Sequence, residues 1–123
     1  MAPISRGNIT IRSSDTRDAP IINPNVFISP TDQQVAVAAY KRMRQILASP
    51  EIAPILVGDE YFPGKDIQSD EELLEHLKDA ASVYYHAGGT CAMGNSEKKG
   101  NKAVVDSRGR VVGVDGVRVV DAS

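Results

Sequence analysis

The sequence YYHAGGTCAMG, at residues 84–94, gathers residue types that are rare elsewhere in this chain. The 123 residues include two histidines and one cysteine, and both His86 and Cys91 lie in this stretch. Histidine is the side chain best matched to moving a proton at neutral pH. Gly88 and Gly89 have no Cβ atom, so a flat ligand or another backbone can approach them closely. The stretch therefore presents His86 as either a proton-transfer residue or a structural histidine.

The spacing of these residues does not decide between the two interpretations. A partly buried His86 would use both ring nitrogens for structural hydrogen bonds, which is the commoner role of a histidine at a strand-to-loop transition. Cys91 is more often a small buried hydrophobe than a nucleophile. Tyr84 and Tyr85 could instead give a pocket an aromatic wall with polar tips, which suits a planar group and a small polar substrate.

The composition excludes several classes of protein. Lys and Arg number 14 against 16 Asp and Glu, and the net charge of −2 argues against a nucleic-acid binder, which needs a basic surface. A single cysteine excludes an internal disulfide and a Cys-rich zinc site, and neither histidine has the neighbours of a zinc ligand, so we expect no metal. No apolar run approaches the roughly 18–20 residues of a membrane span, so we expect no membrane partner. The start MAPISRGNIT has no apolar segment of the signal-peptide type.

Both ends of the chain lie in or close to strand-like runs. GVRVVDAS at 116–123 is an apolar, strand-like run without a polar tail, and GNITIR at 7–12 is strand-like and close to the start. Independent domains usually end in exposed, solvated segments. We therefore expect the chain to be a piece of a larger protein.

The N-terminal quarter predicts one strand and one irregular segment. Residues 7–12 alternate in character, with Ile9 and Ile11 on one side, which is typical of a half-buried strand. Residues 13–30 carry three prolines and scattered apolar residues. Proline disfavours both helix and central strand, so we expect an extended, irregular crossing segment there.

A first helix is predicted to begin at Pro30 and to stop at 48–50. Ser29 is its predicted N-cap, and Asp32 places a carboxylate in the first turn. The predicted buried stripe consists of Val35, Ala39, Met43 and Ile46. Residues 51–68 hold two glycines and two prolines and are predicted to form a loop.

A second helix is predicted to begin after Ser69, which forms a capping box with Glu72. Its predicted buried face consists of Leu73, Leu77 and Ala80. His76 shares the opposite face with charged residues, so it is interpreted as a solvated surface histidine. Near the end of the chain, Asp115-Gly116 predicts a two-residue hairpin turn between strands at 111–114 and 117–120. The sequence thus predicts an α+β fold with two helices and at least three short strands.

Taken together, the motifs resemble those of the glucose–methanol–choline (GMC) oxidoreductases. HAGGTCAMG at 86–94 is similar to the family's His-x-x-Gly-Thr-Cys-x-Met-Gly motif. AVVDSRGRVVGVDGVRVVDAS at 103–123 follows it as in the family, with Val117 in place of the usual leucine. Upstream, SRGNITIRSSDTRDAPIINPNVF at 5–27 is similar to a third family segment, with Thr16 in place of the common proline. The resemblance covers nearly the whole chain in the right order.

The resemblance implies an activity and a set of site residues. The family binds FAD and oxidises small-molecule alcohols, including sugars, by transferring a hydride from the CH–OH carbon to flavin N5. The position matching His86 acts as the general base that removes the hydroxyl proton. The residues before it, here Tyr84 and Tyr85, line the substrate pocket. Asp121 and Ala122 match residues that lie beside the cofactor, whereas Cys91 has no catalytic role in the family.

The resemblance also implies an incomplete fold. We expect a partial substrate-binding domain with a short antiparallel or mixed sheet and two helices, cut from a larger FAD-binding two-domain fold. Residues 1–83 would be the substrate-domain part, and residues 84–123 the catalytic histidine motif with strands close to the flavin. The family's Gly-rich dinucleotide-binding motif is missing, and its second catalytic His or Asn would lie beyond Ser123.

These departures predict that the chain alone neither binds FAD tightly nor oxidises alcohols, and that it needs the missing parts of the parent fold. An alternative is a catalytically dead remnant that acts as a binding or interaction module. The sequence leaves open which alcohol is oxidised and which acceptor takes the electrons. It also leaves the location of the parent open, although many relatives are secreted.

Overall fold

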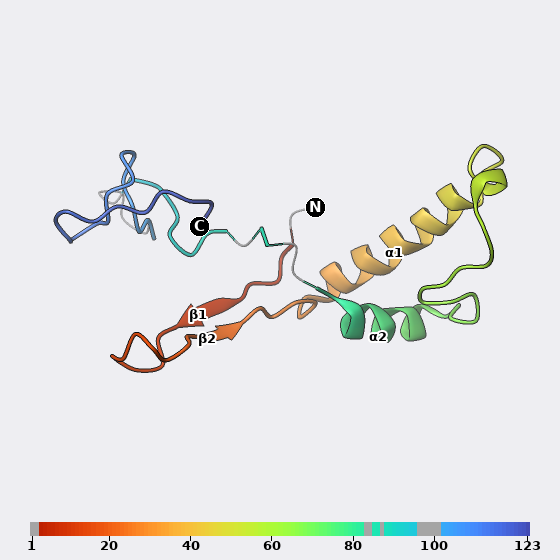
Figure 1. Ribbon diagram of the computed structural model, residues 1–123, viewed down its shortest axis with the longest axis horizontal. Helices are drawn as coiled ribbons and strands as arrows, with labels where there is room; N and C mark the ends of the chain where they lie inside the picture. Colours follow the sequence, from red (N-terminus) through yellow and green to blue (C-terminus); the bar gives the residue numbers. More distant parts are fainter. Residues whose placement is uncertain (1–2, 83–84, 87, 96–101) are drawn as a thin grey trace. The chain divides into compact units, whose positions relative to one another are not determined.

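The structure is a computed structural model that describes residues 3–82, 85–86, 88–95 and 102–123 (Figure 1). It divides into two compact units, Met1–Ala81 and Ser82–Ser123. In the first unit the elements follow the order β1, β2, α1, a short 3-10 turn at Ala53–Ile55 and α2. In the described part of the second unit, turns and isolated β-bridges replace regular elements. The prediction of an α+β chain with two helices is confirmed.

Strands β1, Asn8–Thr10, and β2, Ile21–Asn23, form an antiparallel pair in which Ile9 lies opposite Ile22. A strand within residues 7–12 is therefore confirmed. The prediction that it is half-buried is wrong, because all three residues of β1 are exposed and Ile11 beyond it is 85% exposed. The reason is that β1 and β2 contact chiefly each other, so neither face of this small sheet gains a covering layer.

The presence of β2 corrects the prediction that residues 13–30 are irregular throughout. Pro20 lies just before β2 and Pro24 just after it, so the prolines bound the strand and do not interrupt it. The three residues between them keep the backbone N–H groups that pairing requires. Proline count therefore misled the prediction, whereas proline position explains the strand.

Helix α1, Pro30–Leu47, begins where it was predicted to begin. Ser29 has extended backbone, but its side chain makes no capping hydrogen bond. Instead, the Asp32 carboxylate in the first turn accepts backbone N–H groups from Ile4 at 2.9 Å and Ser5 at 2.7 Å. The Ser5 side chain, followed by these two amides, holds the pKa of Asp32 below its usual value. The carboxylate thus ties the N-terminal segment to the start of α1.

The inward face of α1 differs from the predicted one. Val35, Ala39, Met43 and Ile46, the predicted stripe, are all exposed. Val37 is instead the buried residue of the helix, at 7% exposed. Gln33, Tyr40 and Arg44 are half-buried around it. The face chosen is the one that meets α2 and the loop before it, and these contacts outweigh the apolar stripe that propensity and spacing favoured.

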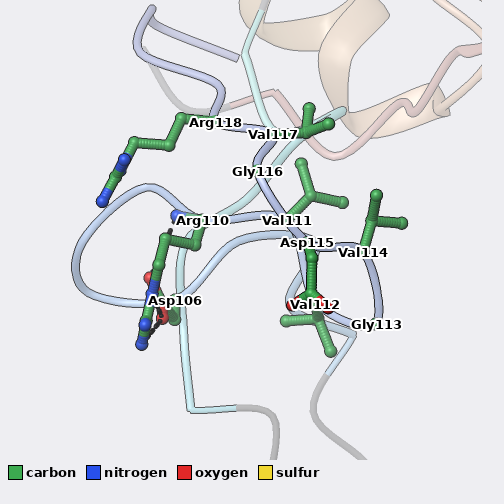
Figure 2. A pocket seen from close by; sticks show the side chains of 10 residues that line it. All are labelled: Asp106, Arg110, Val111, Val112, Gly113, Val114, Asp115, Gly116, Val117 and Arg118. Atoms are coloured by element: carbon green, nitrogen blue, oxygen red, sulfur yellow. Dashed lines mark hydrogen bonds and ion pairs between the residues drawn. The ribbon is translucent and has the colours of Figure 1, made fainter.

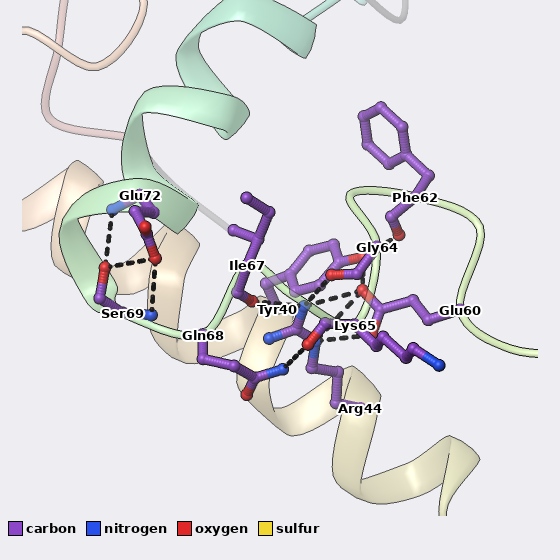
Figure 3. Close-up of polar contacts among 10 residues, drawn as sticks. All are labelled: Tyr40, Arg44, Glu60, Phe62, Gly64, Lys65, Ile67, Gln68, Ser69 and Glu72. Carbon is purple, nitrogen blue, oxygen red and sulfur yellow. Dashed lines mark hydrogen bonds and ion pairs between the residues drawn. The ribbon is translucent and has the colours of Figure 1, made fainter.

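A polar network at Arg44 fastens the loop at 56–68 to α1 (Figure 3). The guanidinium donates to both carboxylate oxygens of Glu60, each at 2.9 Å, and to the carbonyl of Ile67 at 2.9 Å. Tyr40 donates to Glu60 at 3.1 Å and to the carbonyl of Phe62. The Arg44 guanidinium lowers the pKa of Glu60, and burial raises the pKa of Tyr40. A planar, five-donor side chain can hold several acceptors in this way because its geometry is fixed.

Helix α2, Asp70–Ala80, begins with the predicted capping box. Glu72 N–H donates to Ser69 Oγ at 3.2 Å, and Ser69 N–H donates to Glu72 Oε2 at 3.3 Å. Of the predicted buried face, Leu73 is completely buried, at 0% exposed, while Leu77 is half-buried and Ala80 is exposed. The inward face is therefore confirmed in its first two turns.

The prediction that His76 is a solvated surface histidine is wrong. Its ring is half-buried and lies 4.5 Å from the Phe62 ring, centroid to centroid. Its Nε2 atom is sealed from solvent and has no hydrogen-bond partner. The loop held by Arg44 carries Phe62 to this side of α2, which sequence spacing within the helix alone does not indicate.

In the second unit, the chain reverses near the predicted hairpin but with a different register. Val111 N–H donates to the Val117 carbonyl at 3.1 Å, and Arg110 forms a bridge with Arg118. Residues 112–116 therefore form the loop, and the predicted two-residue turn at Asp115-Gly116 is wrong. Gly113 and Gly116 both have left-handed backbone, with φ of 82° and 78°, so the chain bends at two points. Isolated bridges stand where the predicted strands 111–114 and 117–120 were expected.

A search of the helices in the described residues found none with the length and apolar character needed to cross a membrane.

The burial of Leu73 gives a first prediction. In the full-length protein, Leu73→Ala should lower the local stability of α2 by about 2–5 kcal/mol, because it opens a cavity in the core. Native-state hydrogen exchange of the α2 amides measures this change. Leu47→Ala, at a residue 39% exposed on α1, is the matched control and should change stability by less than about 1 kcal/mol. Equal effects of the two substitutions would contradict the assignment of Leu73 as the core residue.

Candidate active site

The turn that carries His86 begins with a strained residue. Tyr85 has φ of 58°, in the left-handed region that bulky residues rarely adopt, and its side chain is 92% exposed. Such a conformation costs about 1–3 kcal/mol and persists only where surrounding structure holds it. His86 follows with an exposed side chain. Gly89 then also has left-handed backbone, with φ of 93°, which glycine adopts without strain.

The last residues of the chain pack against this turn through backbone atoms. The backbone oxygen of Ser123 accepts the N–H of Gly89 at 2.6 Å and the N–H of Cys91 at 3.0 Å. A Cβ atom on Gly88 would lie 3.0 Å from the Ala122 carbonyl oxygen, which is tighter than most real contacts. Of the two neighbours that the sequence allowed for these glycines, a flat ligand or another backbone, the structure shows a backbone close to Gly88. A larger residue at 88 would crowd that approach, and the left-handed backbone of Gly89 provides the bend.

Asp121 organises the segment that makes these contacts. Its Oδ1 accepts the Ser123 N–H at 2.8 Å and also the Ser123 hydroxyl. The hydroxyl, followed by the N–H, lowers the pKa of Asp121 below its usual value. Asp121 and Ala122 are both exposed. The carboxylate is therefore ionised at neutral pH and holds a short turn that presents the Ser123 backbone to the histidine turn.

The structure brings together some of the predicted site residues. His86 and the pair Asp121 and Ala122 belong to one compact unit, and the turn after His86 contacts the Asp-Ala-Ser segment directly. Tyr85 is on the same turn with its ring in solvent. Tyr84 lies outside the described residues. Cys91 is half-buried, and it takes part through its backbone N–H.

A groove of about 610 Å³ follows the contact between the two segments. This volume falls within the range of about 300–1,000 Å³ that small-molecule sites occupy. Small and apolar residues from both segments and from the turns and isolated bridges between them form most of its wall. The lining residues are Gly89, Cys91, Ala92, Met93, Val105, Ser107, Arg108, Gly109, Val119, Val120, Asp121, Ala122 and Ser123. His86 is not part of this lining, so the groove and the histidine are neighbours along the chain and not one cavity.

A second hollow in the same unit, of about 490 Å³, lies under the 112–116 loop (Figure 2). At one end, the Asp106 carboxylate accepts N–H groups from Arg108 at 2.9 Å and Arg110 at 3.0 Å, and the Arg110 side chain at 2.7 Å. The Arg110 guanidinium, followed by these amides, lowers the pKa of Asp106 to about 2. All of these hydrogen bonds join residues within the turn at 106–110, so we interpret them as structural contacts that stabilise the turn.

Sequence reasoning missed Ser123 and Asp106. An Asp followed two residues later by a residue whose N–H it can accept is a known turn pattern, and it occurs both at Asp106-Ser-Arg and at Asp121-Ala-Ser. That pattern was the available signal. Across the described residues, no group of three or more His, Cys, Asp or Glu side chains has the arrangement of a metal site.

Comparison with known proteins now identifies the family. The family described as GMC oxidoreductase matches residues 3–123. The chain belongs to the GMC oxidoreductase family. Its relatives include versicolorin B synthase of Aspergillus parasiticus, 47% identical over 123 residues, and patulin synthase of Penicillium expansum, 49% identical over 121 residues. The two matches cover 100% and 98% of this GMC chain, but the chain spans only about 19% of the length of each relative.

Solved structures also match this GMC chain to one part of a larger protein. It is similar to an FAD-dependent oxidoreductase from Chaetomium thermophilum, with a TM-score of 0.78 and 31% identity, covering 98% of this chain and 20% of that one. It is also similar to pyridoxine 4-oxidase from Mesorbium loti, with a TM-score of 0.75 and 28% identity, covering 98% of this chain and 23% of that one. The α+β arrangement seen here is therefore one part of a larger oxidoreductase fold.

The lowered pKa of Asp106 gives a second prediction. Its folded pKa of about 2 lies below the usual 3.8, so the carboxylate stabilises the fold above pH 3.8 and loses this effect as the pH falls toward 2. In urea unfolding of the full-length protein, the wild type should exceed Asp106→Asn in stability at neutral pH. The difference should shrink over this acidic range. Ser107→Ala, a neutral change in the same turn, should leave the pH dependence unaltered, and a difference that persists undiminished to about pH 2 would contradict the prediction.

Proposed function

We propose that this chain is the C-terminal part of an FAD-dependent oxidoreductase that acts on CH–OH groups of alcohols or sugars. One observation carries the proposal beyond family membership. The turn after His86 is joined to the Asp-Ala-Ser segment by two backbone hydrogen bonds, so the proposed base and the proposed cofactor neighbours belong to one local structure. A site that transfers a proton and a hydride from one carbinol group needs this proximity.

In the proposed reaction, His86 is the general base. Its imidazole accepts the hydroxyl proton of the substrate, which increases the tendency of the carbinol carbon to release a hydride. FAD, when bound, supplies the acceptor for that hydride. His86 follows a strained residue and precedes a glycine turn, and a side chain in this position is aimed by its backbone. His86 is an exposed residue in this chain.

Tyr84 and Tyr85 are proposed to line the substrate pocket. The exposed ring of Tyr85 offers an apolar face and a hydroxyl for a small polar molecule. In this proposal residues 1–83 belong to the substrate domain, and residues 84–123 carry the histidine motif and the strands next to the flavin. The substrate itself is proposed only as a class, a small alcohol or sugar.

Asp121 and Ala122 are proposed to lie beside the FAD. The residues present fit a flat cofactor, because the position of a Cβ on Gly89 opens into space with no atom within 4 Å. Ala92 and Ala122 add only methyl groups to the same groove. Gly89, Asp121 and Ala122 would form the protein side of a planar contact, and the remaining cofactor contacts would come from elsewhere in the parent.

The surface of the chain supports the need for further polypeptide. In the described residues, only Val37, Leu73 and Val105 form a buried apolar core, while Val57 and Val120 are 99% and 86% exposed. Apolar surface on this scale normally contacts another protein segment. The missing parts of the parent enzyme are the proposed partner.

The same exposed apolar surface also fits the alternative function. In that alternative, the chain is a catalytically dead remnant that acts as an interaction module. The two functions differ in what the neighbouring coding sequence must contain. The enzyme requires, in frame, a Gly-rich FAD-binding motif before this chain and a second catalytic His or Asn after it. A stop codon directly after Ser123 and the absence of that upstream motif would favour the remnant.

The role of His86 gives a third prediction. In the full-length protein, His86→Ala should lower turnover of its alcohol substrate by about 10²–10⁴-fold, the usual contribution of a positioned base. Steady-state kinetics with flavin content measured on the same sample provides the test. His76→Gln alters the other histidine of the chain and should keep turnover within about threefold. Near-normal turnover in His86→Ala would defeat the proposed role.

The isolated chain gives a fourth prediction. Expressed and purified alone, residues 1–123 should be colourless, because the main platform for the cofactor is absent from them. Absorbance in the flavin region, compared with the full-length protein at equal concentration, measures this. A yellow preparation with stoichiometric FAD would show that the chain holds the cofactor by itself and would contradict the proposal.

A further inference from the structure

We propose that Asp121 and Ser123 are positioning residues that fix the turn after His86. The inference rests on the proposed function of His86 as base, and it adds a role for two residues that otherwise count as neighbours of the cofactor. It depends on a chain of contacts inside one compact unit, from a carboxylate through a backbone oxygen to the histidine turn.

The first link joins Asp121 to Ser123. One carboxylate oxygen of Asp121 accepts both the N–H of Ser123, at 2.8 Å, and its hydroxyl. Hydrogen bonds to an ionised acceptor are stronger than those between neutral groups. The two donors come from the same residue, so they restrain both its backbone and its side chain. The position of Ser123, whose backbone oxygen faces the histidine turn, is thereby restrained.

The second link joins Ser123 to the histidine turn. Its backbone oxygen accepts from Gly89 at 2.6 Å and from Cys91 at 3.0 Å. These two amides lie on either side of Thr90, so one oxygen fixes the bend at that point. A Cβ atom on Gly88 would lie 3.0 Å from the Ala122 carbonyl oxygen, so glycine at this position lets the two backbones approach closely.

The restraint bears on His86 because the residue before it is strained. Left-handed backbone at Tyr85 is held only if the chain on both sides is fixed. On the C-terminal side, the bonds from Gly89 and Cys91 to Ser123 provide this fixation. Loss of the Asp121 carboxylate would free Ser123, loosen the turn and change the direction of the His86 ring.

A different role for Asp121 would be direct contact with the cofactor and nothing else. That role gives no reason for one carboxylate oxygen to be engaged by two donors from Ser123. The two roles also predict different effects of substitution. A positioning residue should affect the mobility of the 88–94 segment and the turnover rate, whereas a pure cofactor contact should affect the amount of bound flavin.

The experiment uses the full-length holoenzyme and compares Asp121→Ala with Asp121→Asn. In Asp121→Ala, amide hydrogen exchange of the 88–94 segment should become about 5- to 10-fold faster, which corresponds to the loss of one or two hydrogen bonds. Turnover per bound flavin should fall by about 10–100-fold while KM stays within about twofold. Asp121→Asn keeps an oxygen acceptor for Ser123 and should restore most of the exchange protection and turnover.

Asp115→Ala removes an exposed carboxylate elsewhere in the same unit and is the matched control; it should change none of these quantities. If Asp121→Ala fails to fold, Ser123→Ala removes only the hydroxyl and should still raise exchange of the segment by about two- to threefold. Unchanged exchange in both variants overturns the inference. Loss of flavin from Asp121→Ala without faster exchange overturns it too, because it indicates a cofactor contact.

The outcomes separate this inference from the proposed function. If His86→Ala retains turnover while Asp121→Ala still loosens the 88–94 segment, the base assignment fails and the structural link stands as a restraint on the turn. If His86→Ala loses turnover while Asp121→Ala changes neither exchange nor rate, the base assignment stands and the positioning role is overturned.

Discussion

The backbone oxygen of Ser123 is the acceptor on which the arrangement of the second unit depends. It receives two amides from the histidine turn, and a glycine at 88 leaves space for the two backbones to meet. Regular strands are absent from the described part of this unit, so there is no continuous ladder to hold it. Backbone hydrogen bonds between turns, together with the turns at Asp106 and Asp121, therefore stabilise this unit in place of a sheet.

The first unit is held by a different kind of interaction. A guanidinium from α1 joins a carboxylate and two carbonyls of the loop before α2, and the helices enclose a single completely buried leucine. Polar contacts with fixed geometry thus define where the loop lies, while little apolar area is buried. This balance is expected of a segment whose remaining apolar surface contacts other parts of a larger protein.

The sequence predicted where the helices begin better than it predicted which of their faces are buried. The starts of both helices and the capping box followed from local chemistry, since Pro30 and Ser69 act on their immediate neighbours. The buried face of α1 and the surroundings of His76 depended on a loop that is distant along the chain, and periodicity contains no information about it. The predicted hairpin register was wrong for a local reason, because a second glycine at 113 also adopts left-handed backbone and lengthens the loop.

Family motifs are the source of the proposed site residues, and local turn chemistry explains how two of the segments that carry them meet. The strained backbone of Tyr85 has a consequence for how such a chain can change over time. Glycine or asparagine would occupy this conformation with less strain, so selection for thermal robustness alone would remove the aromatic ring. A tyrosine at this position therefore carries an exposed aromatic ring at a cost in backbone strain that glycine or asparagine would largely avoid.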